Sequence, residues 1–133
     1  MSLNVTLRKL LQSFVYAGQG IPVAFRGRNM RVHGAATIAV VGTGLWLGIT
    51  RFEWLILLMF IAAVWSLEMV NTALEELANT MRDTNHLNYK ATKTARDVAA
   101  GAVLVMAIIA AISAGIIFIP YLFPPMMYGP PAY

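Results

Sequence analysis

Residues 98–123 read VAAGAVLVMAIIAAISAGIIFIPYLF, a stretch without a single charged side chain. A helix needs about 20 apolar residues to cross the hydrocarbon core of a bilayer. Residues 34–50 also lack charge, and residues 54–74 are apolar except for Glu68 and Asn71. Because backbone groups cannot stay unpaired in lipid, the sequence predicts an all-α integral membrane protein with three transmembrane helices, over about 33–50, 54–75 and 97–122.

The composition agrees with a membrane protein and excludes several other classes. The 133 residues are 59% hydrophobic and 12% charged, whereas soluble domains are about 45–50% apolar and about 25% charged. A soluble globular enzyme and a disordered chain are therefore excluded. The chain has no cysteine, so it can form neither a disulfide nor a thiolate metal site. Its net charge of +4 suits membrane topology and anionic lipid, and we expect no nucleic-acid partner.

The basic residues predict how the chain is oriented. Five of them precede the first predicted span, four lie between the second and the third, and only Arg51 lies in the turn between the first two. Basic residues concentrate on the cytoplasmic side of membrane proteins. We therefore expect a multi-pass protein of the bacterial inner (cytoplasmic) membrane, with the N-terminus and the 75–97 loop in the cytoplasm and the C-terminus outside.

The two ends of the chain differ from the predicted spans. Residues 7–15 (LRKLLQSFV) place leucine, phenylalanine and valine on one helical stripe and polar residues on the other. This pattern is typical of a helix that lies in the membrane interface, and we expect one over about 5–28. Residues 1–123 then form one membrane domain. Residues 124–133 (PPMMYGPPAY) form a Pro-rich tail to which we assign no function.

Polar residues interrupt the second predicted span. Glu68, Asn71 and Glu75 are separated by three and four residues, which places them on one face of a helix. Seven residues at 1.5 Å each put Glu68 about 10 Å deeper along the axis than Glu75. A carboxyl group at that depth is costly and usually faces a partner or a water-filled cavity. We therefore favour a functional role for Glu68, while Glu75 alone could equally be a solvated helix end.

The third span opens with a complementary set of residues. Arg96 and Asp97 are followed by the small residues of VAAGA, which allow close approach of helices. Together with Glu75 they predict a cluster of carboxylates and positive charge at the cytoplasmic edge. Mg²⁺ is commonly held by one or two carboxylates and by substrate phosphates. A base at lipid depth beside such a site suggests phosphorylation of a lipid hydroxyl.

Residues 68–75 (EMVNTALE) and 96–102 (RDVAAGA) resemble paired motifs of the prokaryotic diacylglycerol kinase family of small membrane lipid kinases. Residues 14–21 (FVYAGQGI) and 28–33 (RNMRVH) also resemble that family, and most of all its undecaprenol-kinase branch. The resemblance implies an ATP- and Mg-dependent transfer of the γ-phosphate to the primary hydroxyl of undecaprenol or diacylglycerol. It also implies a homotrimer whose active sites are completed by a neighbouring subunit.

The resemblance further implies roles for individual residues. Glu68 matches the catalytic base, and Glu75 matches a magnesium ligand. Contacts with the nucleotide or its metal are implied for Asn71, Arg96 and Asp97. Two contacts come from the interfacial helix: Tyr16 matches an aromatic residue, and Lys9 or Arg8 matches a basic one.

One departure from the family pattern bears on the metal. A second metal-ligand glutamate normally precedes the R-N pair, where this chain has Gly27, and no carboxylate occurs between Met1 and Arg51. The chain could therefore be a catalytically impaired or non-catalytic member of the family. A small proton-coupled transporter that uses Glu68 is a further alternative, although it gives no reason for the cluster around Glu75.

Overall fold

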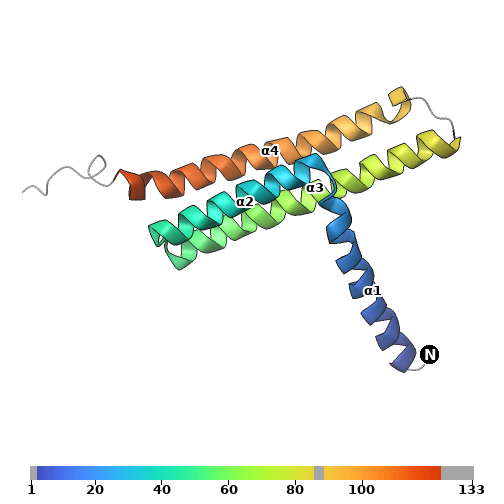
Figure 1. The fold of residues 1–133 in the computed structure, drawn as a ribbon, viewed down its shortest axis with the longest axis horizontal. Coiled ribbons are helices and arrows are strands. Elements are labelled where there is room, and N and C mark those ends of the chain that lie inside the picture. The colour runs from blue at the N-terminus through green and yellow to red at the C-terminus, as the bar shows by residue number, and fades with distance from the viewer. Residues whose placement is uncertain (1–2, 86–88, 124–133) are drawn as a thin grey trace, which may run out of the picture.

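The computed structural model describes residues 3–85 and 89–123, and its regular secondary structure in these ranges is entirely helical. The predicted tail, residues 124–133, lies outside the described residues. Figure 1 shows four helices in the order α1 (Leu3–Ala24), α2 (Arg28–Leu47), α3 (Arg51–Asn85) and α4 (Tyr89–Leu122). The prediction of an all-α protein is therefore confirmed.

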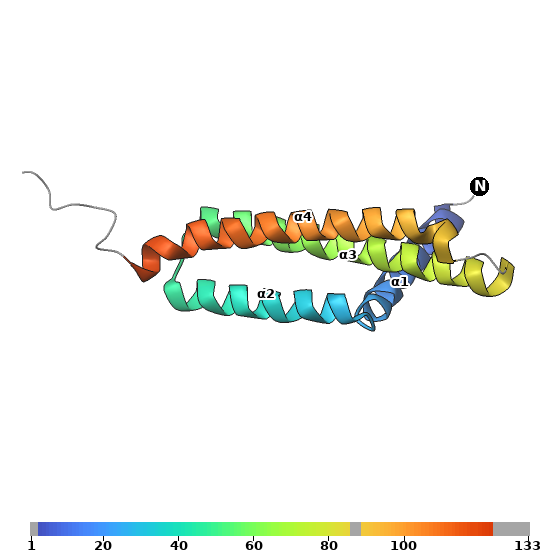
Figure 2. The same cartoon turned by 90° about the horizontal axis from the view of Figure 1, so that it is seen from above.

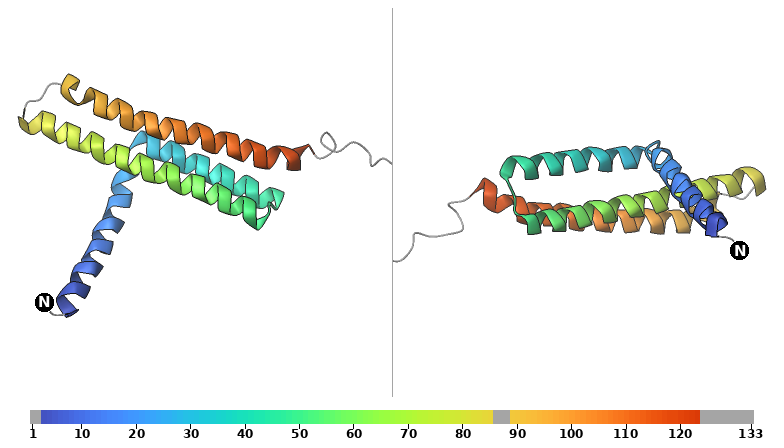
Figure 3. Two further views of the ribbon diagram at one scale, coloured as in Figure 1. Left: turned by 180° about the vertical axis from the view of Figure 1, so that it is seen from behind. Right: turned by 90° about the horizontal axis from the view of Figure 1, so that it is seen from below.

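The long helices α3 and α4 form the frame of the molecule. They run side by side and antiparallel in both Figure 1 and Figure 2. The shorter α2 lies against this pair from one side, and α1 leaves the bundle at a steep angle, as both views in Figure 3 show. The arrangement leaves α1 largely without partners in the single chain.

A short turn separates α1 from α2. The helix predicted over residues 5–28 ends at Ala24, and Gly27 adopts an extended conformation (φ −65°, ψ 139°) as the residue that precedes α2. The Gly27 amide donates to the Ala24 carbonyl over 3.1 Å. Along α1 the apolar stripe is exposed, with Phe14 68% accessible, so this stripe is available to a bilayer surface.

A tight turn joins α2 to α3 at the opposite end of the bundle. Gly48 ends α2 in the left-handed region (φ 66°), where glycine carries no steric penalty. Close packing also requires Gly44, because a Cβ atom there would lie 3.0 Å from the Trp54 ring. The buried residues Ile49, Leu57, Ala114 and Ile117 form the apolar core beside this turn.

The stretch predicted as a 75–97 loop is mostly helical, so that prediction was wrong. α3 continues to Asn85 and α4 already begins at Tyr89. In the polar part of α3 after Glu75, Thr80 Oγ1 donates a hydrogen bond to the Glu76 carbonyl (2.9 Å) and Thr84 Oγ1 donates one to the Thr80 carbonyl (2.7 Å). Polar composition alone therefore did not end these helices.

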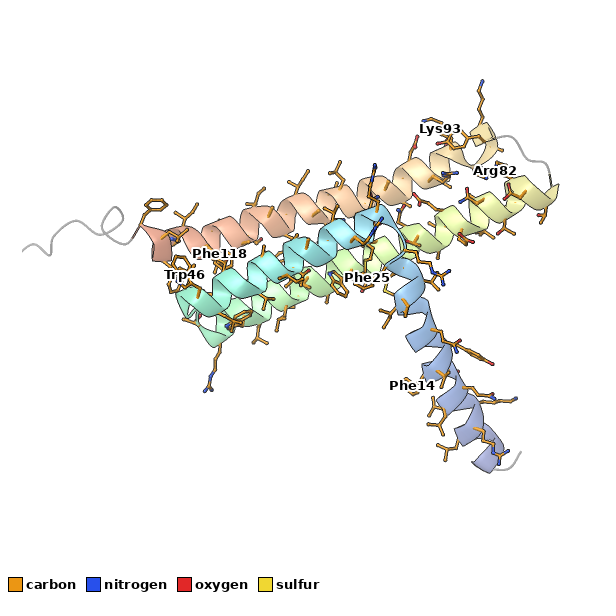
Figure 4. The ribbon with its side chains drawn as sticks, viewed as in Figure 1. Phe14, Phe25, Trp46, Arg82, Lys93 and Phe118 are labelled. Atoms are coloured by element: carbon orange, nitrogen blue, oxygen red, sulfur yellow. The ribbon has the colours of Figure 1, made fainter. Side chains whose placement is uncertain are left out.

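Two of the described helices, α3 and α4, are long and apolar enough to cross a membrane. Their apolar side chains are largely exposed in the single chain, as for Ile108, Ile112 and Ile116 of α4, unlike those of a core helix in a soluble protein. Figure 4 shows Arg82 and Lys93 at one end of this pair and Phe118 at the other. The span predicted over 33–50 belongs mainly to α2, and its crossing of the bilayer stays a prediction.

Candidate active site

Three predicted site residues lie in the middle of α3 and share one face. Glu68 is 3% exposed and Asn71 is 1% exposed, while Glu75 is half-buried. The Asn71 side-chain amide donates to a Glu75 carboxylate oxygen over 3.5 Å, which is the long limit for such a contact. The helical spacing of these residues therefore places one buried carboxyl group deep in the bundle and a second one near its polar end.

The oxygen atoms at this face fit a hard cation. Asn71 Oδ1 is buried and has no hydrogen-bond partner, and a buried acceptor in that condition is costly unless something binds it. With the Glu75 carboxylate it offers two hard oxygen donors. The described residues contain no group of three or more metal-ligating side chains. An ion such as Mg²⁺ would therefore rely on substrate phosphates for its remaining ligands.

The predicted site residues of α4 are engaged along their own helix. Asp97 forms an ion pair with Lys93 one turn earlier, and the Arg96 guanidinium lies 4.8 Å from the centre of the Tyr89 ring. Among the described residues, neither side chain forms an ion pair with Glu75. The single chain thus places Arg96 and Asp97 at the polar end of the bundle but does not join them to the carboxylates of α3.

The predicted site residues of α1 are farther from the cluster. Tyr16 is 66% exposed and Lys9 is also exposed. Both lie on the part of α1 that leaves the bundle, where Figure 4 labels Phe14. One chain alone therefore does not bring the α1 residues to Glu68.

A polar cavity opens beside Glu68. Its volume is about 170 Å³, and its polar lining consists of Glu68 from α3 with Asn29 and His33 from α2. The sequence analysis included Asn29 and His33 in the 28–33 motif but predicted no role for either side chain. The four-residue spacing of Asn29 and His33, which places both on one helical face, was the signal that could have found them.

An apolar cavity of about 160 Å³ lies next to the polar one. It is lined by residues of α2, α3 and α4, among them Val40, Phe60 and Ile61. The buried carboxyl group of Glu68 thus lies beside a space that suits hydrocarbon. Such an arrangement can remove a proton from an alcohol whose tail lies in an apolar environment.

Comparison with known proteins identifies the family to which the chain belongs. The model of the family "Prokaryotic diacylglycerol kinase" matches residues 15–118. The chain is 39% identical over 117 residues to undecaprenol kinase of Bacillus subtilis (strain 168), covering 87% of this chain and 93% of the relative. It is 37% identical over 113 residues to diacylglycerol kinase of Synechocystis sp. (strain ATCC 27184 / PCC 6803 / Kazusa), covering 84% of this chain and 63% of that protein. No solved structure matches the chain significantly. This membrane protein belongs to the prokaryotic diacylglycerol kinase family of lipid kinases.

Proposed function

We propose that this lipid kinase transfers the γ-phosphate of ATP to the primary hydroxyl of a membrane lipid alcohol in the presence of Mg²⁺, with undecaprenol as the preferred acceptor and diacylglycerol as the alternative. The observation that carries the proposal is the Glu68 carboxyl group, which is 3% exposed and lines a cavity between three helices. The preference for undecaprenol is based on the similarity to undecaprenol kinase of Bacillus subtilis, because the chain matches 93% of the length of that relative.

In the proposed reaction Glu68 acts as the general base. The lipid hydroxyl oxygen forms a bond to the γ-phosphorus, and the bond from that phosphorus to the β,γ-bridging oxygen breaks. The hydroxyl proton moves to the Glu68 carboxylate, and ADP leaves with the electron pair of the broken bond. Phosphoryl transfer of this kind depends mainly on positioning and charge stabilisation.

The nucleotide would bind at the polar end of the bundle. Glu75 and the unpartnered Asn71 Oδ1 would hold Mg²⁺ there. A bound Mg²⁺ ion would neutralise charge on the transferring phosphates. Arg96 and Asp97 would contact the nucleotide from α4, and Lys9 or Arg8 with Tyr16 from α1. Gly27 supplies no carboxylate, so we expect weaker metal binding than two carboxylate ligands would give.

We further propose a homotrimer in the inner membrane, with α2 as a third span and α1 in the cytoplasmic interface. Two features support this arrangement. Tyr16 and Lys9 are exposed and lie away from the α3 cluster of their own chain, so a neighbouring subunit would have to supply them. The apolar faces of α1 and α4 are exposed as well, and lipid or neighbouring helices would cover them.

The test is a phosphorylation assay with purified protein, labelled ATP, Mg²⁺ and a panel of undecaprenol, farnesol and diacylglycerol in mixed micelles. The proposal is supported if the rate of labelled lipid phosphate formation is highest with undecaprenol. Formation of none under a range of Mg²⁺ and Mn²⁺ concentrations would instead indicate a non-catalytic member of the family.

A further inference from the structure

The polar and the apolar cavity meet at two residues. His33 and Ala107 line both of them, and of these two only His33 has a polar side chain. His33 therefore lies at the boundary between the space beside Glu68 and the space that suits hydrocarbon. A molecule with an apolar tail in one cavity and a reactive end at Glu68 would therefore extend along a wall that includes this imidazole.

A hydrogen bond joins α2 to α3 one helical turn from His33. The Trp65 indole Nε1 donates to Thr37 Oγ1 over 3.0 Å, and the Thr37 hydroxyl donates to the His33 carbonyl over 2.8 Å. Trp65 belongs to α3 and lies three residues before Glu68, on the same side of the helix. The Phe25 ring meets Trp65 edge-on, with ring centres 5.2 Å apart. The turn of α2 that carries His33 is thereby held against the turn of α3 that carries Glu68.

The side chains of His33 and Glu68 share a cavity but are not bonded to one another. Both line the polar cavity, and no hydrogen bond or ion pair joins them within the described residues. A neutral imidazole carries one donor and one acceptor nitrogen. An alcohol oxygen placed between the two groups can accept a hydrogen bond from the imidazole while its own proton points to the Glu68 carboxylate.

We propose that His33 binds the reacting hydroxyl of the lipid alcohol beside Glu68, and that the Trp65–Thr37 hydrogen bond holds the His33 turn of α2 against α3. The apolar cavity would hold the part of the hydrocarbon tail next to that hydroxyl. This inference rests on the proposed lipid-kinase function and adds a substrate-binding residue to it. Glu68 accepts the proton, whereas His33 orients the oxygen and takes part in no bond exchange.

Steady-state kinetics test the role of His33. His33→Ala is expected to lower kcat/KM for undecaprenol by about tenfold, the effect of one lost hydrogen bond, with less than about a twofold change in KM for ATP. His33→Gln, which keeps a donor, should restore part of the loss. Thr37→Val, which removes the Trp65–Thr37 hydrogen bond, should also lower kcat/KM for undecaprenol, but by a smaller factor. Val32→Ala is the matched control, because Val32 is the neighbouring residue and is 61% exposed.

Two kinetic results would overturn the inference. One is an unchanged kcat/KM for undecaprenol in His33→Ala. The other is an equal loss towards lipid and ATP, which would indicate general damage to the fold. The activity of the wild-type enzyme in the same assay separates these results from a failure of the proposed function. An inactive wild-type enzyme would contradict the proposed lipid-kinase activity, whereas an active one restricts the test to His33.

A binding measurement tests His33 without any turnover. The chain has two histidines, so in His86→Asn the ring of His33 gives the only imidazole signals in an NMR spectrum of histidine-labelled protein. Farnesol, a single-chain alcohol, is expected to shift these signals on titration in micelles, and farnesene, a hydrocarbon with no oxygen to accept a hydrogen bond from the imidazole, is expected to shift them much less. Equal shifts with both compounds, or no shift with farnesol, would contradict a bond to the hydroxyl.

Discussion

Glu68 is the residue whose environment most needs an explanation, because a buried carboxyl group among apolar helices is costly. If it acts as the base, Glu68→Gln should lower phosphate transfer to lipid by about 10²–10⁴-fold, the usual contribution of a general base. Nucleotide binding should change little, since the polar end of the bundle is untouched. The rate of labelled phospholipid formation measures the first effect, and titration with a fluorescent ATP analogue measures the second.

The control for this prediction is Glu76→Gln. Glu76 lies on the same helix and is exposed, so loss of its charge leaves the buried face unchanged and activity should be retained. An active Glu68→Gln enzyme would remove Glu68 from the proposed step.

At Gly27 the chain offers a gain-of-function test of the metal site. Its backbone angles (φ −65°, ψ 139°) are accessible to any residue, and an added Cβ would lie 3.2 Å from the Ala24 carbonyl oxygen, so that this backbone atom has to shift by a few tenths of an ångström. Gly27→Glu adds a carboxylate near the start of α2, and we expect half-maximal activity at a lower Mg²⁺ concentration. A Mg²⁺ titration of activity measures this, with Gly27→Gln as the uncharged control. An equal response of both variants would show that charge at this position does not serve the metal.

At the scale of elements, the end of the bundle opposite the site is held by a capped turn. Thr50 and Glu53 form a reciprocal cap at the start of α3, with Glu53 Oε2 accepting from the Thr50 amide and hydroxyl at 2.7 Å each, and the Glu53 amide donating to Thr50 Oγ1 over 3.3 Å. The Tyr121 hydroxyl donates to the same carboxylate oxygen over 2.8 Å and so joins the end of α4 to the start of α3.

We expect both Glu53→Ala and Tyr121→Phe to lower the midpoint of thermal unfolding by a few degrees, with the larger effect for Glu53, because its loss removes the helix cap as well as the link to α4. Lipid kinase activity at low temperature should be unchanged. Circular dichroism of the protein in detergent measures the midpoint, and Phe52→Ala serves as the control, because Phe52 is adjacent and 71% exposed. Equal stability of Glu53→Ala and the wild type would contradict the role of this cap.

Sequence patterns predicted some elements better than others, for physical reasons. The uncharged run in α4 and the spacing of Glu68, Asn71 and Glu75 are local signals, and a helix over each follows directly from them. The polar end of α3 gave no hydrophobic signal, so its continuation to Asn85 was missed. The placement of His33 in the same cavity as Glu68 could not be predicted from local spacing, because the two are 35 positions apart and only the packing of α2 on α3 brings them together.

At the scale of the whole molecule, the position of α1 leads to a prediction about assembly. Lys9 and Tyr16 are exposed on a helix that leaves its own bundle, so a site that uses them would combine α3 of one subunit with α1 of another. Two variants are used: Glu68→Gln, and the double substitution Lys9→Ala with Tyr16→Ala. Each variant should be inactive as a pure oligomer. Mixed in equal amounts in detergent before reconstitution, they should recover roughly a quarter of wild-type activity, because each shared site draws its two halves from independent chains. A lipid kinase assay across mixing ratios measures the recovery, and re-mixing of either variant with itself should recover none. No recovery at any ratio, with subunit exchange verified by two fluorescent labels, would mean that each chain completes its own site.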